Sequence, residues 1–292
     1  MIYEDEDEQI SPVDINGAEL LKRLYLRDPN EGGMDIEATG PKGCGKTSLI
    51  FDITSNIMKF NPEELVFMRD RYESPVQFNR FDKWCIWVQD SISLKFRDIT
   101  NNSFFDLPVM SFKDYDEIYE QAKPGIVNVI YLDDEYNWIR KDGIIDFLRR
   151  HSHRIGNRYL DQTLTTPIWK TIIFTEYEDV CPINESKPIW SYCKDFTGIL
   201  KETRKGMTSI LFDTQNSWDC DHRVRGKISM KAYLKGAKVD KISPIEQYAV
   251  NSLGEHNGQR QALICLAQTF GKIRFNAFKP KELLFEVIKV NQ

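Results

Sequence analysis

The sequence lacks any long apolar run, although 41% of its 292 residues are hydrophobic. A membrane-crossing helix needs about 20 consecutive apolar residues, so no span is expected. The first residues, MIYEDEDEQI, are acidic rather than basic, which is not the pattern of a secretory signal. Internal repeats are absent as well. Together these absences predict a cytoplasmic protein.

Paired cysteines are also missing. The six cysteines are scattered and none forms a C-x-x-C pair, so free thiols are predicted rather than disulfides. A zinc site can be drawn from Cys181, Cys193, Cys220 and His222, but their spacing matches no standard zinc knuckle. Zinc binding is therefore not the preferred interpretation.

The net charge of −5 conceals an asymmetry along the chain. Residues 1–200 contain 23 basic and 35 acidic side chains, whereas residues 201–292 contain 16 basic and 9 acidic ones. A basic C-terminal third on an acidic protein suits contact with a polyanion such as DNA. An unevenly charged, solvated surface explains the same numbers equally well.

What the sequence does contain is the octapeptide GPKGCGKT at Gly40–Thr47. It fits G-x-x-x-x-G-K-[ST], the pattern of a phosphate-binding loop. The segment before it, 34–39, alternates as a strand does, and 48–60 has apolar residues at helical spacing. This order directs backbone N–H groups and a helix N-terminus toward an anion. The motif therefore predicts a nucleotide site.

The expected ligands of this loop are ATP and Mg²⁺. Lys46 would reach the β- and γ-phosphates, and the hydroxyl of Thr47 would ligate the metal. The predicted nucleotide-binding residues are consecutive: Gly40, Pro41, Lys42, Gly43, Cys44, Gly45, Lys46, Thr47 and Ser48.

Alternating strand and helix patterns predict an α/β fold, with a mostly parallel sheet covered by helices on both faces. We expect an acidic disordered tail at 1–12 and a P-loop ATPase core at 13–242. Residues 243–292 are expected to form a small, mainly helical appendage, with helices ending near 252 and over 259–270 and 281–289. A winged-helix-like module is the alternative for this appendage.

An apolar strand that ends in acids is the expected partner of a phosphate loop, and Ile126–Glu135 reads IVNVIYLDDE. In the preferred register Asp134 binds the metal and Glu135 is the general base that polarises the attacking water. In the other register Asp133 takes the metal role. A glutamate directly after the metal aspartate favours hydrolysis over the reaction of a nucleotide kinase.

Another apolar strand, ILFDTQ, ends at Gln215, whose amide could orient water or respond to the γ-phosphate. Three arginines are candidates for a finger that neutralises transition-state charge on a neighbouring subunit's ATP. We rank Arg204 first, Arg225 second and Arg223 third.

The order GPKGCGKT, VIYLDDEY, RKGMTSILFDTQ and DHRVRGKI resembles the FtsK/HerA superfamily of P-loop ATPases, and within it the viral genome-packaging ATPases and Zot-like proteins. The resemblance covers roughly residues 33–236 and implies a RecA-like core. It implies that Lys46 and Thr47 bind phosphate and Mg²⁺, Asp134 the metal, Glu135 water and Gln215 the γ-phosphate.

The same resemblance implies a homo-oligomeric ring, hexameric in the family, that carries ATP between subunits and translocates double-stranded DNA. A viral capsid or portal protein is a further candidate partner. Two other functions stay open. One is a regulatory P-loop ATPase that contacts protein rather than DNA, and the other is a nucleotide kinase, against which Glu135 speaks.

One departure from the family concerns spacing, because 80 residues separate Glu135 from Gln215. If the motif assignment is shifted, Thr175 or Glu176 would stand where Gln215 is placed, and Glu176 is a further candidate for the base. The intervening stretch also holds RRHSHRIGNR at 149–158, which is either a DNA-phosphate contact or a solvated helix face.

Overall fold

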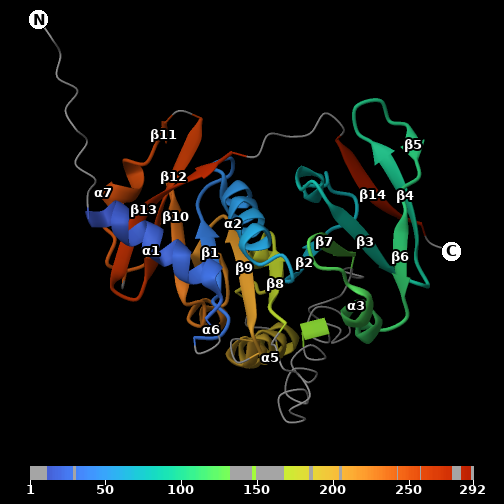
Figure 1. Ribbon diagram of the computed structural model, residues 1–292, viewed down its shortest axis with the longest axis horizontal. Helices are drawn as coiled ribbons and strands as arrows, with labels where there is room; N and C mark the ends of the chain where they lie inside the picture. The colour runs from blue at the N-terminus through green and yellow to red at the C-terminus, as the bar shows by residue number, and fades with distance from the viewer. Residues whose placement is uncertain are drawn as a thin grey trace, which may run out of the picture.

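The largest element of the molecule is one wide sheet with helices on both of its faces (Figure 1). The structure is a computed structural model that describes residues 12–28, 31–131, 147–148, 168–183, 187–203, 206–241, 243–256, 258–277 and 284–290. The predicted acidic tail thus lies almost wholly outside the described residues. The α/β class and the mostly parallel sheet expected from the sequence are confirmed.

Eight neighbouring strands of this sheet are parallel, in the order β10-β1-β9-β8-β2-β7-β3-β6. In chain order they are β1 (Ile36–Thr39), β2 (Leu65–Asp70), β3 (Trp84–Gln89), β6 (Val109–Phe112), β7 (Val127–Tyr131), β8 (Lys170–Phe174), β9 (Thr208–Thr214) and β10 (Met230–Leu234). The central strands are buried along their whole length. Their sequences are mostly apolar and do not alternate between apolar and polar residues.

Helices cover this sheet from two sides and define two apolar cores. One core joins α1 (Pro12–Leu26) and α2 (Lys46–Phe60) to the sheet, and the other joins α3 (Tyr115–Gln121), α5 (Lys187–Thr203) and α6 (His222–Arg225). Shorter helical segments are α7 (Gln247–Asn251), η1 (Phe78–Arg80), η2 (Tyr177–Asp179) and η3 (Ser217–Asp219). Helices therefore cover both faces of the sheet. Ligands of such sheets bind at the carboxyl ends of the parallel strands.

The C-terminal region differs from the expected helical appendage. Residues 259–270, predicted as a helix, form β12 (Gln259–Leu266) and the start of β13 (Thr269–Asn276), and β11 (Glu255–His256) precedes them. β12 pairs antiparallel with β10, so the main sheet continues into these strands. A short apolar run such as ALICL does not distinguish a buried strand from a buried helix, and pairing with β10 decided for the strand.

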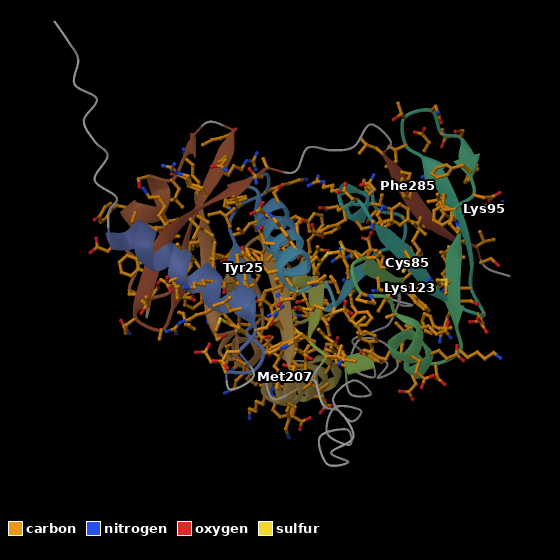
Figure 2. All side chains as sticks on the ribbon, viewed as in Figure 1. Tyr25, Cys85, Lys95, Lys123, Met207 and Phe285 are labelled. Carbon is orange, nitrogen blue, oxygen red and sulfur yellow. The ribbon has the colours of Figure 1, made fainter. Side chains whose placement is uncertain are left out.

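A second sheet joins the end of the chain to its middle. The segment predicted as a helix over 281–289 overlaps β14 (Phe285–Val290), which pairs antiparallel with β4 (Ser93–Asp98). β4 in turn pairs with β5 (Phe104–Phe105). Phe285, labelled in Figure 2, packs with its ring against the rings of Phe78, Trp84, Phe96 and Phe105. This aromatic cluster explains why the segment is a strand, because alternate residues then enter one core.

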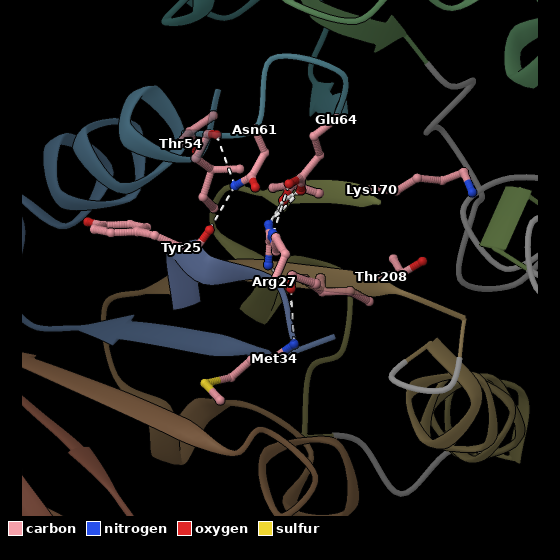
Figure 3. Close-up of polar contacts among 12 residues, drawn as sticks. Tyr25, Arg27, Met34, Thr54, Asn61, Glu64, Lys170 and Thr208 are labelled. Carbon is pink, nitrogen blue, oxygen red and sulfur yellow. Dashed lines mark hydrogen bonds and ion pairs between the residues drawn. The ribbon is translucent and has the colours of Figure 1, made fainter. Parts of the chain in front are cut away.

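A buried ionic network closes the amino edge of the sheet (Figure 3). Arg27, at the end of α1, donates from Nε and Nη2 to the two carboxylate oxygens of Glu64 at 2.8 and 2.5 Å. It also donates to the hydroxyls of Thr171 on β8 and Ser209 on β9, both at 2.7 Å. The two charged side chains are 3% and 0% exposed, so each depends on the other for its charge.

All six cysteines are free thiols, as predicted. Across the part of the chain that the structure describes, no helix has the length and apolarity that a membrane crossing requires.

Candidate active site

The glycine loop lies between β1 and α2, so the strand and the helix predicted on its two sides are confirmed. α2 begins at Lys46, and Gly45 before it has φ 104°, a left-handed conformation that favours glycine. No side chain caps this N-terminus. Because the first N–H groups of a helix have no intrahelical partner, those of α2 can bind an anion.

Lys46 lies over the loop itself. Its ammonium donates to the carbonyl of Pro41 at 3.3 Å, and the residue is 8% exposed. The amino-acid order thus places a cation above backbone N–H groups in one small space, which is the arrangement that binds the phosphates of a nucleotide.

The partner of Thr47 is a carboxylate that the sequence interpretation missed. The hydroxyl of Thr47 donates to Oδ2 of Asp213 at 2.7 Å, and the backbone N–H of Glu176 donates to the other carboxylate oxygen at 2.5 Å. Asp213 lies on β9, directly beside β1 in the sheet. A single acid inside the apolar run ILFDT is costly to bury unless it is paired, and this was the available signal.

Burial raises the pKa of Asp213 to about 6. Hydrogen bonds from the backbone of Glu176 and the hydroxyl of Thr47 oppose the rise, as does the charge of Lys46. A cation bound next to this carboxylate would lower its pKa, because a positive charge favours the ionised form.

The donor set fits Mg²⁺. A hydroxyl and a carboxylate supply oxygen ligands, and Mg²⁺ in nucleotide sites is held by one or two carboxylates together with phosphates. Among the described residues, no group of three or more His, Cys, Asp or Glu side chains is placed to hold a metal ion. Two protein oxygen ligands leave coordination positions for phosphate oxygens, so Thr47 and Asp213 suit a metal shared with a nucleotide.

Gln215 also reaches the edge where the loop lies. It follows β9 immediately, and the N–H of Gly40 donates to the carbonyl of Thr214 at 3.3 Å. The N–H of Gln215 donates to Glu178 at 3.1 Å, and the residue is exposed. The predicted location beside the phosphate loop thus agrees with the geometry, and its predicted role at the γ-phosphate stays a prediction.

The predicted acids Asp134 and Glu135, with the alternative Asp133, lie outside the described residues. The strand that leads to them, β7, is four positions from β1, or about 19 Å at the usual strand spacing of about 4.8 Å. β8, which leads to Thr175 and Glu176, is only two positions from β1. Sheet order therefore brings a different acidic strand end toward the loop.

Glu176 follows β8 in a left-handed conformation, with φ 51°. Its backbone bonds Asp213, while its side chain is 50% exposed and forms an ion pair with Arg71 at 3.2 Å. Arg71 follows β2, the next strand of the sheet. Glu176 is thus anchored to the Thr47 partner through its main chain and keeps a carboxylate at the open edge.

The three candidate finger arginines have different settings. Arg204 lies outside the described residues. Arg225 stacks over the ring of Trp218 at 4.2 Å and donates to the carbonyl of Ser217. Arg223 pairs with Asp221 and stacks over Trp190 at 4.7 Å. Their predicted roles toward a neighbouring subunit stay predictions.

Arg260 is a fourth arginine, and the sequence interpretation did not select it. It lies on β12, and its Nη1 donates to the carbonyl of Gly43 inside the glycine loop at 3.1 Å. No local sequence signal marks it, because only the pairing of β12 with β10 brings it there.

No family model matches the sequence, and no curated protein matches it. Solved structures do match in shape. The genome-packaging NTPase B204 of Sulfolobus turreted icosahedral virus 2, in complex with ATP-gammaS, is similar with a TM-score of 0.47 and 13% identity over 86% of this chain and 99% of that one.

Two further similar structures are larger proteins. EssC (ATPases 2 and 3) from Geobacillus thermodenitrificans matches with a TM-score of 0.47 and 9% identity, over 87% of this chain and 41% of that one. The conjugation coupling protein TcpA of pCW3 matches with a TM-score of 0.47 and 11% identity, over 85% and 62%.

Proposed function

We propose that the protein is an ATP-hydrolysing motor that moves double-stranded DNA, working as a ring with ATP between its subunits. The observation that carries the proposal is the bond between Thr47, in a glycine loop that opens a helix, and the buried carboxylate of Asp213. A phosphate cradle and an acid that could serve a metal then share one edge of a parallel sheet.

In this proposal the residues of the loop bind the phosphates of ATP, and residues at the ends of the neighbouring strands take part in hydrolysis. Lys46 and the N–H groups at the start of α2 hold the phosphates. Thr47 and Asp213 would supply oxygen ligands for Mg²⁺, and Asp213 holds the hydroxyl of Thr47 in place. When bound, Mg²⁺ would neutralise charge on the phosphate oxygens. Gln215, which directly follows β9 and lies two residues after Asp213, would orient the attacking water or respond to hydrolysis.

For the residue that polarises water we propose Glu176, ahead of Glu135. The end of β8 is two strands from β1, whereas the end of β7 is four strands away. The backbone bond to Asp213 further ties Glu176 to the metal side of the site. Its pairing with Arg71 would be broken when the carboxylate turns to water, at small cost because half-exposed ion pairs are weak.

DNA as the moved substrate is supported by the order of motifs in the sequence and by the basic balance of residues 201–292. The ring is proposed from the resemblance in motif order. The finger candidate Arg225 is engaged with its own chain through Trp218 and Ser217, which ranks it behind Arg204. We propose that Arg204 supplies charge to the ATP of the next subunit, with Arg225 and then Arg223 as the alternatives.

The proposal is tested by steady-state ATP turnover of the purified protein with and without double-stranded DNA. We expect Mg²⁺-dependent hydrolysis that DNA stimulates, and its loss in Lys46→Ala. Turnover that Lys46→Ala leaves unchanged would remove the basis of the proposal. Hydrolysis that responds to no DNA would instead favour the regulatory ATPase that contacts protein.

The assignment of the base is tested separately. Glu176→Gln should reduce turnover by about 100-fold or more while ATP binding persists, since loss of a general base typically costs 10²–10⁴. Glu135→Gln is the matched comparison, with the same chemical change on the other strand. If Glu135→Gln alone abolishes turnover, the role returns to the acids after β7.

A further inference from the structure

The antiparallel strands that extend the main sheet reach the phosphate loop. Ala262 on β12 pairs with Leu234, the last residue of β10, and β10 runs parallel to β1. Arg260, two residues earlier on β12, therefore lies beyond the carboxyl end of β10, at the edge where the loop begins. In the β12–β13 ladder it is opposite Phe275, a residue of the apolar core that contains α2.

At this position the guanidinium of Arg260 touches the loop twice. Nη1 donates to the carbonyl of Gly43 at 3.1 Å. A Cβ added to Gly45 would lie 2.7 Å from Nη1 and 3.0 Å from Cδ of the same side chain. Gly45 has a positive φ that favours glycine, and the end of the Arg260 side chain lies beside the position of its missing Cβ, immediately before the start of α2.

The charge of Arg260 is only partly engaged by its neighbours. A guanidinium carries five N–H donors in a fixed plane, and the contacts described here use Nη1 on Gly43 and Nε near Glu255 at 3.7 Å. The side chain is 33% exposed, so it borders solvent. A planar cation with remaining donors next to an anion cradle matches the geometry of phosphate oxygens.

We propose that Arg260 binds the polyphosphate of the nucleotide, contributed by the same chain that contributes the glycine loop. This inference rests on the proposed nucleotide site. It makes Arg260 the second positively charged side chain of that site, after Lys46. The sheet extension of residues 255–276 is then part of the nucleotide site.

The key variant is Arg260→Gln, because glutamine keeps a donor for the carbonyl of Gly43 and loses the charge. The readout is the equilibrium dissociation constant of ATP, ADP and adenosine, measured by titration calorimetry. We expect Arg260→Gln to weaken ATP and ADP about tenfold or more, equivalent to about 1.4 kcal/mol, and to leave adenosine unchanged. Arg260→Lys should lie between the variant and the native protein.

Arg274→Gln, the same chemical change at another position of the sheet, is the matched control. Arg274 is exposed on β13 and pairs with Gln261, one position along the ladder from Arg260, so its side chain points to the opposite face of the sheet. It should bind ATP as the native protein does. Equal weakening in both variants would assign the effect to net charge and overturn the proposal.

Other outcomes also decide. If Arg260→Gln binds ATP as the native protein does, Arg260 only clips the loop and the inference fails. Equal weakening for adenosine would place the contact on the nucleoside and overturn it too. Lys46→Ala distinguishes failure of the proposed nucleotide site from failure of the Arg260 proposal. If Lys46→Ala binds ATP with native affinity, the nucleotide site itself is wrong. If Lys46→Ala weakens ATP binding but Arg260→Gln does not, only the role of Arg260 is wrong.

Discussion

At the scale of single residues, two carboxylates are buried at the ends of mostly apolar strands. Asp213 and Asp70 are both buried, at 1% and 6% exposure, and both have a raised pKa because of that burial. They differ in their neighbours. Asp213 accepts from Thr47 in the loop, whereas Asp70 accepts from Tyr131 and from the backbone of Arg71. Asp213 is therefore the acid of the proposed metal site, whereas we expect Asp70 to affect stability.

Asp213→Asn should impair the reaction without unfolding the protein. Asparagine keeps an acceptor for Thr47 but removes the negative charge that a metal requires. We expect turnover at saturating Mg²⁺-ATP to fall by about 100-fold or more, since this change removes charge from the proposed metal shell. Asp219→Asn, at an exposed position that follows the same strand, is the control and should keep native turnover.

Asp70 predicts a pH dependence of stability. Burial raises its pKa from 3.8 to about 7 in the folded protein. Between these values the unfolded chain has lost the proton and the folded protein retains it, so stability falls as pH rises. The loss is complete above pH 7 and amounts to at most roughly 4 kcal/mol.

Denaturant unfolding between pH 4.5 and 7.5 measures this contribution. Asp70→Asn cannot ionise, so its free energy of unfolding should rise relative to that of the native protein as pH increases. Asp90→Asn, at an exposed site, should follow the native curve. Parallel curves for Asp70→Asn and the native protein would contradict the assignment.

At the scale of elements, α1 is held on the sheet by contacts that could not be predicted from its local sequence pattern. The network around Arg27 connects α1 to the segment before β2 and to β8 and β9 (Figure 3). Gly17 in α1 approaches β13 so closely that a Cβ would lie 2.4 Å from the carbonyl of Lys272. α1 is thus fixed on the sheet that carries the phosphate loop.

Arg27→Ala should destabilise the protein by about 3–5 kcal/mol, because it leaves the carboxylate of Glu64 buried without its partner. The double variant Arg27→Met with Glu64→Leu removes both charges and should recover most of that loss. Thermal unfolding of the three proteins checks this. Lys22→Ala on the exposed side of α1 serves as the control, and a double variant as unstable as Arg27→Ala would argue against the ion pair as the cause.

At the scale of the whole molecule, the order of strands decides which chemistry meets at the loop. β9 and β8 stand between β1 and β2, and β7 stands on the far side of β2. Asp213 and Glu176 therefore come to the glycine loop from strands that are distant from it in the chain. The C-terminal strands complete the same edge through Arg260.

The proposed ring makes assembly depend on nucleotide. If ATP lies between subunits, a non-hydrolysable ATP analogue should increase the mass measured by light scattering, and Lys46→Ala should prevent the increase. ADP should be less effective, because the γ-phosphate is what an arginine from the neighbour would contact. Arg204→Ala should still bind nucleotide and hydrolyse it slowly. A mass that stays that of one chain under all conditions would contradict a ring.

Much of the local structure could be predicted from the sequence. The octapeptide at Gly40–Thr47 and its flanking segments are confirmed as strand, loop and helix, because glycine conformation and apolar periodicity are local properties. The parallel sheet also followed from continuous apolar runs. The strand β4 (Ser93–Asp98) belongs to the second sheet rather than the main one, and its own pattern could not show this because pairing partners are not encoded there.

By itself, then, the sequence determined that a glycine-rich loop stands between a strand and a helix, and it predicted parallel strands around that loop, since glycine conformation and apolar periodicity depend on neighbours along the chain. Only the tertiary structure decided which acids and which arginine face that loop. Asp213, Glu176 and Arg260 are 166, 129 and 213 residues beyond Thr47. Their approach depends on strand order and on the antiparallel extension of the sheet, which arise from packing across the whole molecule.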